Sequence, residues 1–93
     1  MFKVNSYFDG KVTSLGFKSA EGDATSGVIA PGEYEFNTGR PERMEITSGA
    51  ADVQLKGEHF WTSFPAGTHF HVPEGSSFKI RVAADTTYLC YFG

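Results

Sequence analysis

The sequence predicts an all-β protein, built as a sandwich or barrel of short strands. Many segments alternate apolar and polar residues, and none shows an apolar helical period long enough to predict a helix. Eleven glycines and four prolines separate these segments at short, regular intervals, as in sandwiches and barrels. Aromatic residues are plentiful (nine Phe, four Tyr and one Trp), and such residues favour strands.

The first third of the chain predicts strands separated by glycine turns. Residues 1–8 alternate weakly and end at the turn signal Asp9-Gly10. Residues 11–17 predict a second strand with a bulge or bend near Gly16. Residues 19–26 are polar and predict a loop. A short apolar strand at 27–30 then stops at the Pro-Gly pair that follows it.

The middle of the chain alternates most clearly. Residues 33–38 place three side chains on one face, which we expect to point into the core: Tyr34, Phe36 and Thr38. After the Gly39-Arg40-Pro41 break, residues 42–48 alternate again. Their inward set is expected to be Glu42, Met44, Ile46 and Ser48, with Arg43 on the opposite face.

The last third continues the pattern and brings the total to about nine short strands. Further strands are predicted at 51–55, 59–64, 68–72, 77–82 and 87–92. Alternation puts Phe70, Val72 and Phe78 inside, and it puts His69 and His71 outside.

Length and charge narrow the function classes. With 93 residues the chain predicts a single domain, residues 1–93. A formal charge of −3 argues against a nucleic-acid-binding surface. No stretch approaches the ~20 apolar residues of a membrane span, so we expect no membrane partner. Cys90 is the only cysteine and the start shows no apolar signal segment, so we expect a cytoplasmic protein with a buried, inert thiol.

The spacing of turns and acidic residues resembles that of the cupins, which are small double-stranded β-helix (jelly-roll) barrels. Their first motif runs from a His-x-His pair through a gap to Glu, then six residues to Gly, as Glu42 and Gly49 are spaced. Their second motif runs from Gly over five residues to Pro-x-Gly-x-x-His, as Gly67 and Pro73-Glu74-Gly75 are spaced. The His positions fall on Phe36, Thr38 and Phe78, or on Glu35 and Asn37 in place of the first two if the gap is longer. Only Glu42 remains of the metal ligands, so we expect no metal and no cofactor.

Nearly the whole chain is similar to one narrower family, the pyrimidine/purine nucleoside phosphorylases among the short cupins. The matching stretches are Tyr7-Phe8, Gly10-Lys11-Val12, Ser14-Leu15-Gly16-Phe17, Pro31-Gly32-Glu33-Tyr34, Glu42 with Met44, Ser48-Gly49 and Tyr88-Leu89-Cys90. The resemblance implies phosphorolysis of purine and pyrimidine nucleosides to free base and ribose 1-phosphate. It implies nucleosides and inorganic phosphate as the partners.

Two charged residues are the candidates for catalysis. Phosphorolysis passes through a sugar cation, as glycoside hydrolysis does, so an inward carboxylate at Glu42 would stabilise the developing charge. The alternative is a solvated carboxylate paired with an arginine. Arg40 and Arg43 flank Glu42, and a guanidinium can clamp phosphate through two hydrogen bonds. We favour Arg40, because its loop should lie at a barrel mouth; Arg43 is more simply read as a surface charge.

Five further residues are candidates for substrate binding. Thr38 and Ser48 offer hydroxyl groups, although bonds within the core are the commoner fate of an inward hydroxyl. Tyr34, Phe36 and Phe78 offer rings on which any base can stack, and plain core packing is their alternative role.

Two other functions stay open on the sequence. One is a non-enzymatic cupin that binds a small metabolite; the other is a metal enzyme that combines Glu42 with histidines. His69-x-His71 looks like a metal pair, but both residues point outward and no third ligand is evident, so a surface pair is favoured. A chain this short gains stability by pairing, so we expect a homodimer, with Tyr7 and Phe8 covering the partner.

Overall fold

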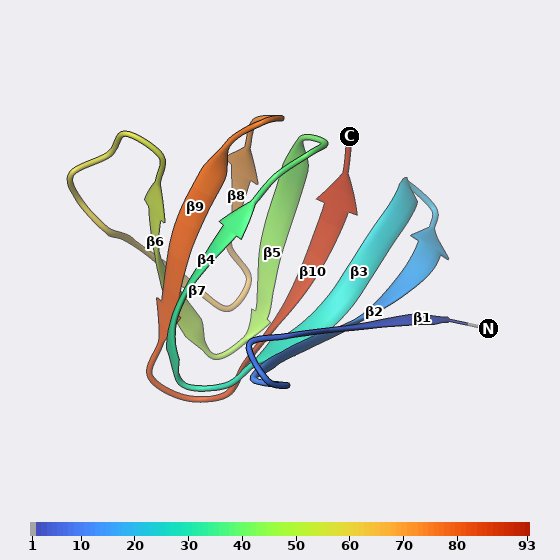
Figure 1. Ribbon diagram of the computed structural model, residues 1–93, viewed down its shortest axis with the longest axis horizontal. Coiled ribbons are helices and arrows are strands. Elements are labelled where there is room, and N and C mark those ends of the chain that lie inside the picture. The colour runs from blue at the N-terminus through green and yellow to red at the C-terminus, as the bar shows by residue number, and fades with distance from the viewer. Residues whose placement is uncertain (1) are drawn as a thin grey trace.

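The computed structural model describes residues 2–93, which form ten β-strands in two antiparallel sheets (Figure 1). In chain order the strands are β1 (Lys3–Tyr7), β2 (Val12–Ser19), β3 (Gly22–Ile29), β4 (Gly32–Asn37), β5 (Glu42–Ser48), β6 (Ala50–Leu55), β7 (Thr62–Pro65), β8 (His69–Val72), β9 (Ser77–Val82) and β10 (Thr86–Phe92). One sheet has the order β1-β2-β3-β10-β5-β8 and the other the order β4-β9-β6-β7. The predicted all-β fold is confirmed.

The two sheets differ in width, and this difference creates the site. Figure 1 shows β1, β2 and β3 extending to one side, beyond the strands of the four-stranded sheet. The turn after β1 bends back over β4, where Phe8 contacts the ring of Tyr34 (centroids 5.0 Å apart) and Tyr7 meets Phe36 edge-on at 6.0 Å. Tyr7 and Phe8 therefore pack on their own chain while remaining partly exposed.

The polar segment 19–26 is not a loop, which corrects the sequence prediction. Strands β2 and β3 pair continuously from Val12–Ile29 to Ser19–Gly22, leaving a two-residue turn between them. The Ser19 hydroxyl supports this turn by donating to the Gly22 carbonyl at 2.8 Å and accepting the Glu21 N–H at 3.1 Å. The register is also unbroken through Gly16, so the bulge expected there is absent and Leu15 simply points outward.

A bulge lies instead between β5 and β10, and it corrects the predicted orientation of Ser48. The register steps from Thr87–Ser48 to Tyr88–Ile46, so Thr47 has no partner of its own in β10. One extra residue reverses the alternation, because side chains in a strand point to alternate faces. Glu42, Met44 and Ile46 keep the inner face as predicted, whereas Ser48 is exposed.

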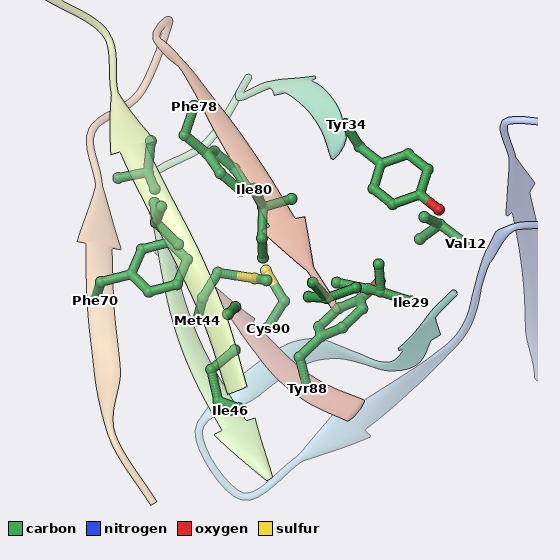
Figure 2. Close-up of a cluster of buried hydrophobic side chains, with 14 residues drawn as sticks. Val12, Ile29, Tyr34, Met44, Ile46, Phe70, Phe78, Ile80, Tyr88 and Cys90 are labelled. Atoms are coloured by element: carbon green, nitrogen blue, oxygen red, sulfur yellow. The ribbon is translucent and has the colours of Figure 1, made fainter. Parts of the chain in front are cut away.

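The core lies between the two sheets, where aliphatic and aromatic side chains from both layers meet (Figure 2). Its most enclosed side chains include Val12, Ile29, Ile46, Val53 and Ile80. Gly49 carries the chain from one sheet to the other with φ of +82°, and a Cβ there would lie 2.6 Å from the Thr86 hydroxyl oxygen. Only glycine fits this crossing without strain.

Candidate functional site

A pocket of about 200 Å³ opens between the two sheets, beside the core. Strands β1, β2, β3, β5 and β10 of the larger sheet supply one wall, and β4 and β9 of the smaller sheet supply the other. Its polar lining groups are Tyr7, Ser14, Thr25, Asn37, Glu42, Tyr88 and Cys90. Its apolar lining groups are Ile29, Phe36, Met44, Phe78, Ile80 and Phe92.

Glu42 brings the carboxylate of this pocket. It is the first residue of β5, half-buried, and its Oε1 accepts a hydrogen bond from the Cys90 thiol at 3.4 Å. No Lys, Arg or His forms an ion pair with it anywhere in residues 2–93. Burial raises the pKa of Glu42 above its usual value of 4.5, and the bond from Cys90 offsets this only in part. The alternative of a carboxylate paired with an arginine is therefore wrong.

Cys90 and Tyr88 lie on the same face of β10 and are both buried (Figure 2). Cys90 is buried as predicted, and burial, aided by the charge of Glu42, raises the pKa of its thiol and favours the protonated form. Burial also raises the pKa of Tyr88 to about 12. A neutral phenol and a neutral thiol thus face the pocket at physiological pH.

Gly27 makes the room that Tyr88 occupies. The two residues pair directly across β3 and β10, and a Cβ on Gly27 would lie 2.5 Å from the Tyr88 hydroxyl oxygen. Tyr88, Ser14 and Thr25 were not among the predicted site residues. They come from strands that pair only in the folded chain; Ser14 and Tyr88 stand in stretches that match the family, but no local spacing marks them as pocket residues.

Two of the predicted aromatic residues line the pocket with Glu42. Phe36 and Phe78 are paired residues of β4 and β9, and their rings stack at 5.7 Å between centroids. Both occupy positions where a cupin motif carries metal-binding histidines. Tyr34 is buried but lies away from the pocket: its hydroxyl donates to the Ala30 carbonyl at 2.7 Å.

The two predicted hydroxyl ligands do not reach the pocket. Thr38 is buried and its Oγ1 donates to the Pro73 carbonyl at 2.6 Å while accepting the Ser76 N–H at 2.9 Å. Thr38 thus joins the loop after β4 to the loop before β9. This is the alternative stated for it above, a hydroxyl whose hydrogen bonds are made within the protein. Ser48 is excluded from the inner face by the bulge in β5.

Arg40 lies at the rim, and its guanidinium is 5.5 Å above the ring of Phe92, a pocket residue. Its Nε donates to the Gly93 carbonyl at 3.0 Å and its Nη1 contacts Asp23 at 3.2 Å. Arg43 is on the outer face, as predicted, where it binds both carboxylate oxygens of Glu21 and packs on Tyr91.

The two histidines of β8 are exposed, with their rings 5.3 Å apart. Within residues 2–93, no three His, Cys, Asp or Glu side chains are grouped closely enough to hold a metal ion. No helix in the same range is long and apolar enough to cross a membrane.

The fold is that of a small cupin, and its pocket combines aromatic walls with a carboxylate that has no ion-pair partner in residues 2–93. A cupin of the RmlC type from Shewanella frigidimarina shares the fold at a TM-score of 0.77, with 15% identity over 99% of this chain and 83% of that one. The cupin class predicted from the motif spacing is confirmed.

The chain belongs to the pyrimidine/purine nucleoside phosphorylase family, whose model matches residues 2–92. A pyrimidine/purine nucleoside phosphorylase of Pseudomonas fluorescens is 55% identical over 99% of this chain and 98% of its own, and one of Tolumonas auensis is 53% identical over 99% of both. A crystal structure of a protein of unknown function from Vibrio parahaemolyticus has a TM-score of 0.93 and 47% identity, covering 97% of this chain and 96% of that one. The family predicted from the sequence is confirmed.

Proposed function

We propose that this protein is a metal-independent nucleoside phosphorylase of broad base specificity that acts at the pocket between its two sheets. Family membership and relatives more than 50% identical support the activity. In the reaction, a phosphate oxygen bonds to C1′ of the ribose, and the C1′–N bond breaks with its electron pair going to the base. The base takes up a proton, and the products are free base and ribose 1-phosphate.

The observation that carries the location is the unpaired, half-buried carboxylate of Glu42. Burial raises its pKa because its negative charge lacks a compensating cation. The ribose gains positive charge in the transition state and would supply that compensation beside Glu42. A charge that is costly in the ground state and offset in the transition state lowers the barrier to reaction.

The aromatic wall would hold the base. Stacking on Phe36 and Phe78 requires only a flat ring, so it suits purines and pyrimidines alike. The neutral Tyr88 hydroxyl would donate a hydrogen bond to the leaving base as negative charge gathers there. At about 200 Å³ the pocket is smaller than the roughly 300–1,000 Å³ of most ligand sites, so part of the nucleoside would extend toward the rim and Arg40.

Base release measures the function directly. Purified protein is incubated with uridine or adenosine, with and without phosphate, and free base is separated by chromatography. We expect release that depends on phosphate and falls at least about 100-fold in Glu42→Gln, given the size of electrostatic effects at active sites. Glu45→Gln is the matched control, because Glu45 lies on the same strand but outside the pocket.

The possible results distinguish the type of reaction from the role of Glu42. Phosphate-independent release indicates hydrolysis, and binding without release indicates a non-enzymatic cupin. Equal activity in Glu42→Gln and Glu45→Gln would contradict the role of Glu42 while leaving the activity standing.

Homodimerisation is a further part of the proposal. The outer face of β1–β3 carries exposed apolar side chains, with Val4 64%, Val28 48% and Leu15 44% exposed. Val4 and Leu15 are cross-strand neighbours, so they form one patch, and β1 leaves a free edge beside it. Light scattering at micromolar concentration should give twice the 10.2 kDa chain mass; a monomer would contradict the proposal.

We also place the enzyme in the cytoplasm, where nucleosides and phosphate are available. The single thiol, which is free and needs no disulfide partner, is consistent with that compartment.

A further inference from the structure

A second, wider hollow adjoins the pocket at its rim. It measures about 840 Å³ and lies along the inner side of β1–β3, where these strands extend beyond the smaller sheet. Tyr7, Thr25 and Phe92 line both the pocket and this hollow, which we call the rim groove. A ligand in the rim groove therefore lies next to a ligand in the pocket.

The rim groove is cationic although the chain as a whole is acidic. Its charged lining residues are Lys3, Lys18 and Arg40 on the positive side and only Asp23 on the negative side. The full chain instead carries a net charge of −3. Such a local reversal of sign concentrates anions at a surface.

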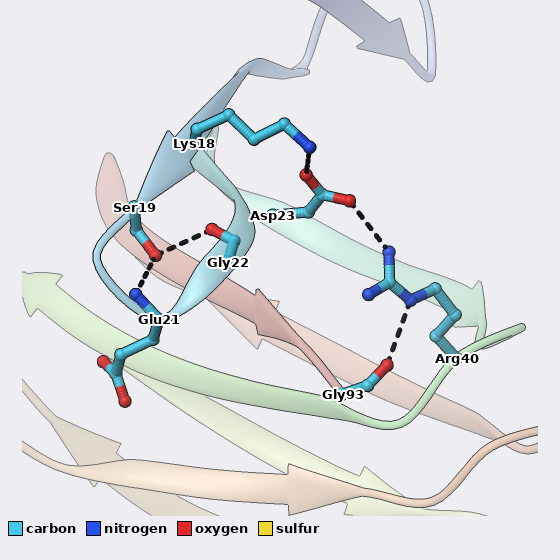
Figure 3. Close-up of polar contacts among 7 residues, drawn as sticks. All are labelled: Lys18, Ser19, Glu21, Gly22, Asp23, Arg40 and Gly93. Atoms are coloured by element: carbon cyan, nitrogen blue, oxygen red, sulfur yellow. Dashed lines mark hydrogen bonds and ion pairs between the residues drawn. The ribbon is translucent and has the colours of Figure 1, made fainter.

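The Asp23 carboxylate already occupies the centre of this arrangement (Figure 3). It is bound on one side by the Lys18 ammonium and on the other by Nη1 of Arg40 at 3.2 Å. These hydrogen bonds, that of Lys18 first, hold the pKa of Asp23 below its usual value, so the carboxylate remains charged. Lys18 and Arg40 are thus placed so that a single anion can contact both.

The carboxylate is not held tightly. The side chains of Lys18, Arg40 and Asp23 are 85%, 53% and 43% exposed, so water screens these ion pairs and they contribute little. A phosphate dianion carries twice the charge of a carboxylate and more acceptor oxygens. It can displace Asp23 without a large cost.

Arg40 is the cation of this group that is held in a fixed place. Its Nε donates to the carbonyl of Gly93, and its plane lies over Phe92, which lines the pocket as well as the groove. The hydrogen bond and the ring together orient a guanidinium, which is suited to phosphate.

We propose that the rim groove is the phosphate subsite of the reaction. Inorganic phosphate is held between Lys18 and Arg40, and Lys3 adds a third positive charge to the groove. The role of the groove in phosphorolysis rests on the proposed function, whereas its ability to bind phosphate does not. Asp23 acts as a resident competitor: it holds the two cations in place when phosphate is absent and is displaced when phosphate binds.

The test compares two variants with a matched control, using the steady-state KM for phosphate at saturating uridine. In Asp23→Asn the competitor is gone, so we expect the KM for phosphate to fall several-fold. In Lys18→Ala one cationic contact is lost, so we expect the KM for phosphate to rise about fivefold to tenfold. The KM for uridine should change less than twofold in both.

Asp52 is the matched control for Asp23. It forms an exposed pair with Arg81 at 3.2 Å, the same distance as the pair of Asp23 with Arg40, but it lies on β6, away from the groove. Asp52→Asn removes the same charge from the protein and should leave the KM for phosphate unchanged. If it lowers this KM as much as Asp23→Asn does, the effect is one of net charge and the proposal is overturned.

Isothermal titration with inorganic phosphate, without nucleoside, separates this proposal from the proposed function. Phosphate binding that Asp23→Asn strengthens and Lys18→Ala weakens supports the subsite even where no base is released. Phosphorolysis with an unchanged phosphate KM in both variants overturns the subsite and leaves the activity standing. Neither binding nor turnover in the wild-type protein overturns both.

Discussion

Replacing Gly27 by alanine directly perturbs the packing of Tyr88, which lines the pocket. The added Cβ would lie 2.5 Å from Cζ and Oη of Tyr88 and 2.6 Å from Cε1, well inside van der Waals contact. Both residues belong to the interior of a continuous pair of strands, so the backbone cannot easily yield and the ring must shift. Forcing an extra group into a packed core costs about 1–3 kcal/mol.

Thermal unfolding measures this cost. In a domain of this size each kcal/mol lowers Tm by about 4–8 °C, so we expect Gly27→Ala to lower Tm by at least about 4 °C. Gly16→Ala is the matched control, because its Cβ would meet Lys3 at an ordinary 3.7 Å on the neighbouring strand. It should change Tm little or raise it, since alanine reduces the entropy of the unfolded chain by about 0.4–1 kcal/mol at compatible sites.

A double-mutant cycle assigns the cost to the ring. In a Tyr88→Leu background the atoms that the new Cβ meets are gone, so Gly27→Ala should cost much less there than in the wild-type protein. The displaced ring of Gly27→Ala would also narrow the pocket, raising the KM for nucleoside. An unchanged Tm in Gly27→Ala, or an equal cost in both backgrounds, would refute the packing described for Gly27 and Tyr88.

Three further predictions concern single polar groups. Burial raises the pKa of Glu42, so its carboxyl destabilises the fold as pH rises above the unfolded value of 4.5, and the full penalty is reached above the folded-state pKa. Glu42→Gln should therefore raise Tm near neutral pH, with the gain vanishing below about pH 4. An unchanged or lowered Tm at neutral pH would contradict this. Thr38→Val removes both hydrogen bonds of a buried hydroxyl, so it should lower the free energy of unfolding in urea by about 1–3 kcal/mol without altering the KM for phosphate. A raised KM for phosphate would indicate that Thr38 takes part in phosphate binding. The Cys90 thiol should resist iodoacetamide at pH 8 until the protein unfolds, because burial raises its pKa. Rapid labelling of the folded protein would show that reagent reaches Cys90 through the pocket.

Activity should also depend on pH through Glu42. The charged carboxylate is the form that stabilises the sugar cation, so the turnover rate should fall as pH drops through a pKa above 4.5. A profile that stays flat down to that value would count against a catalytic charge on Glu42.

The strands that alternate most clearly were predictable because each has one face in the core and one in water. Residues 33–38 and 77–82 show this, and their inward residues Tyr34, Phe78 and Ile80 are buried as expected. Segment 19–26 was misread because its side chains are small and polar on both faces, so alternation carries no signal there. The bulge at Thr47 was not predictable either, since it arises from the register with β10, some 40 residues further along the chain.

The site was predictable only where it coincides with a local motif. Glu42, Phe36 and Phe78 stand at spacings set by turns, and the structure brings all three to one pocket. Ser14, Thr25 and Tyr88 line the same pocket because β2, β3 and β10 pair side by side, and this non-local pairing leaves no mark in the local spacing of residues. Asp23 was hidden within the segment read as a loop, and Lys18 lies just before that segment, outside any predicted element.

The proposed role of Glu42 fits the phenylalanines that stand at the metal-ligand positions of the cupin motif. In a metal-binding cupin the ion would compensate the carboxylate at this position. Phe36 and Phe78 supply no charge, so the half-buried carboxylate has no cation beside it to offset the rise in pKa that burial causes. What can compensate it is a positive charge that appears within the pocket itself, and a ribose undergoing phosphorolysis develops one at C1′. With phenylalanine at both positions, the proposed site therefore offers a carboxylate that a sugar cation can compensate.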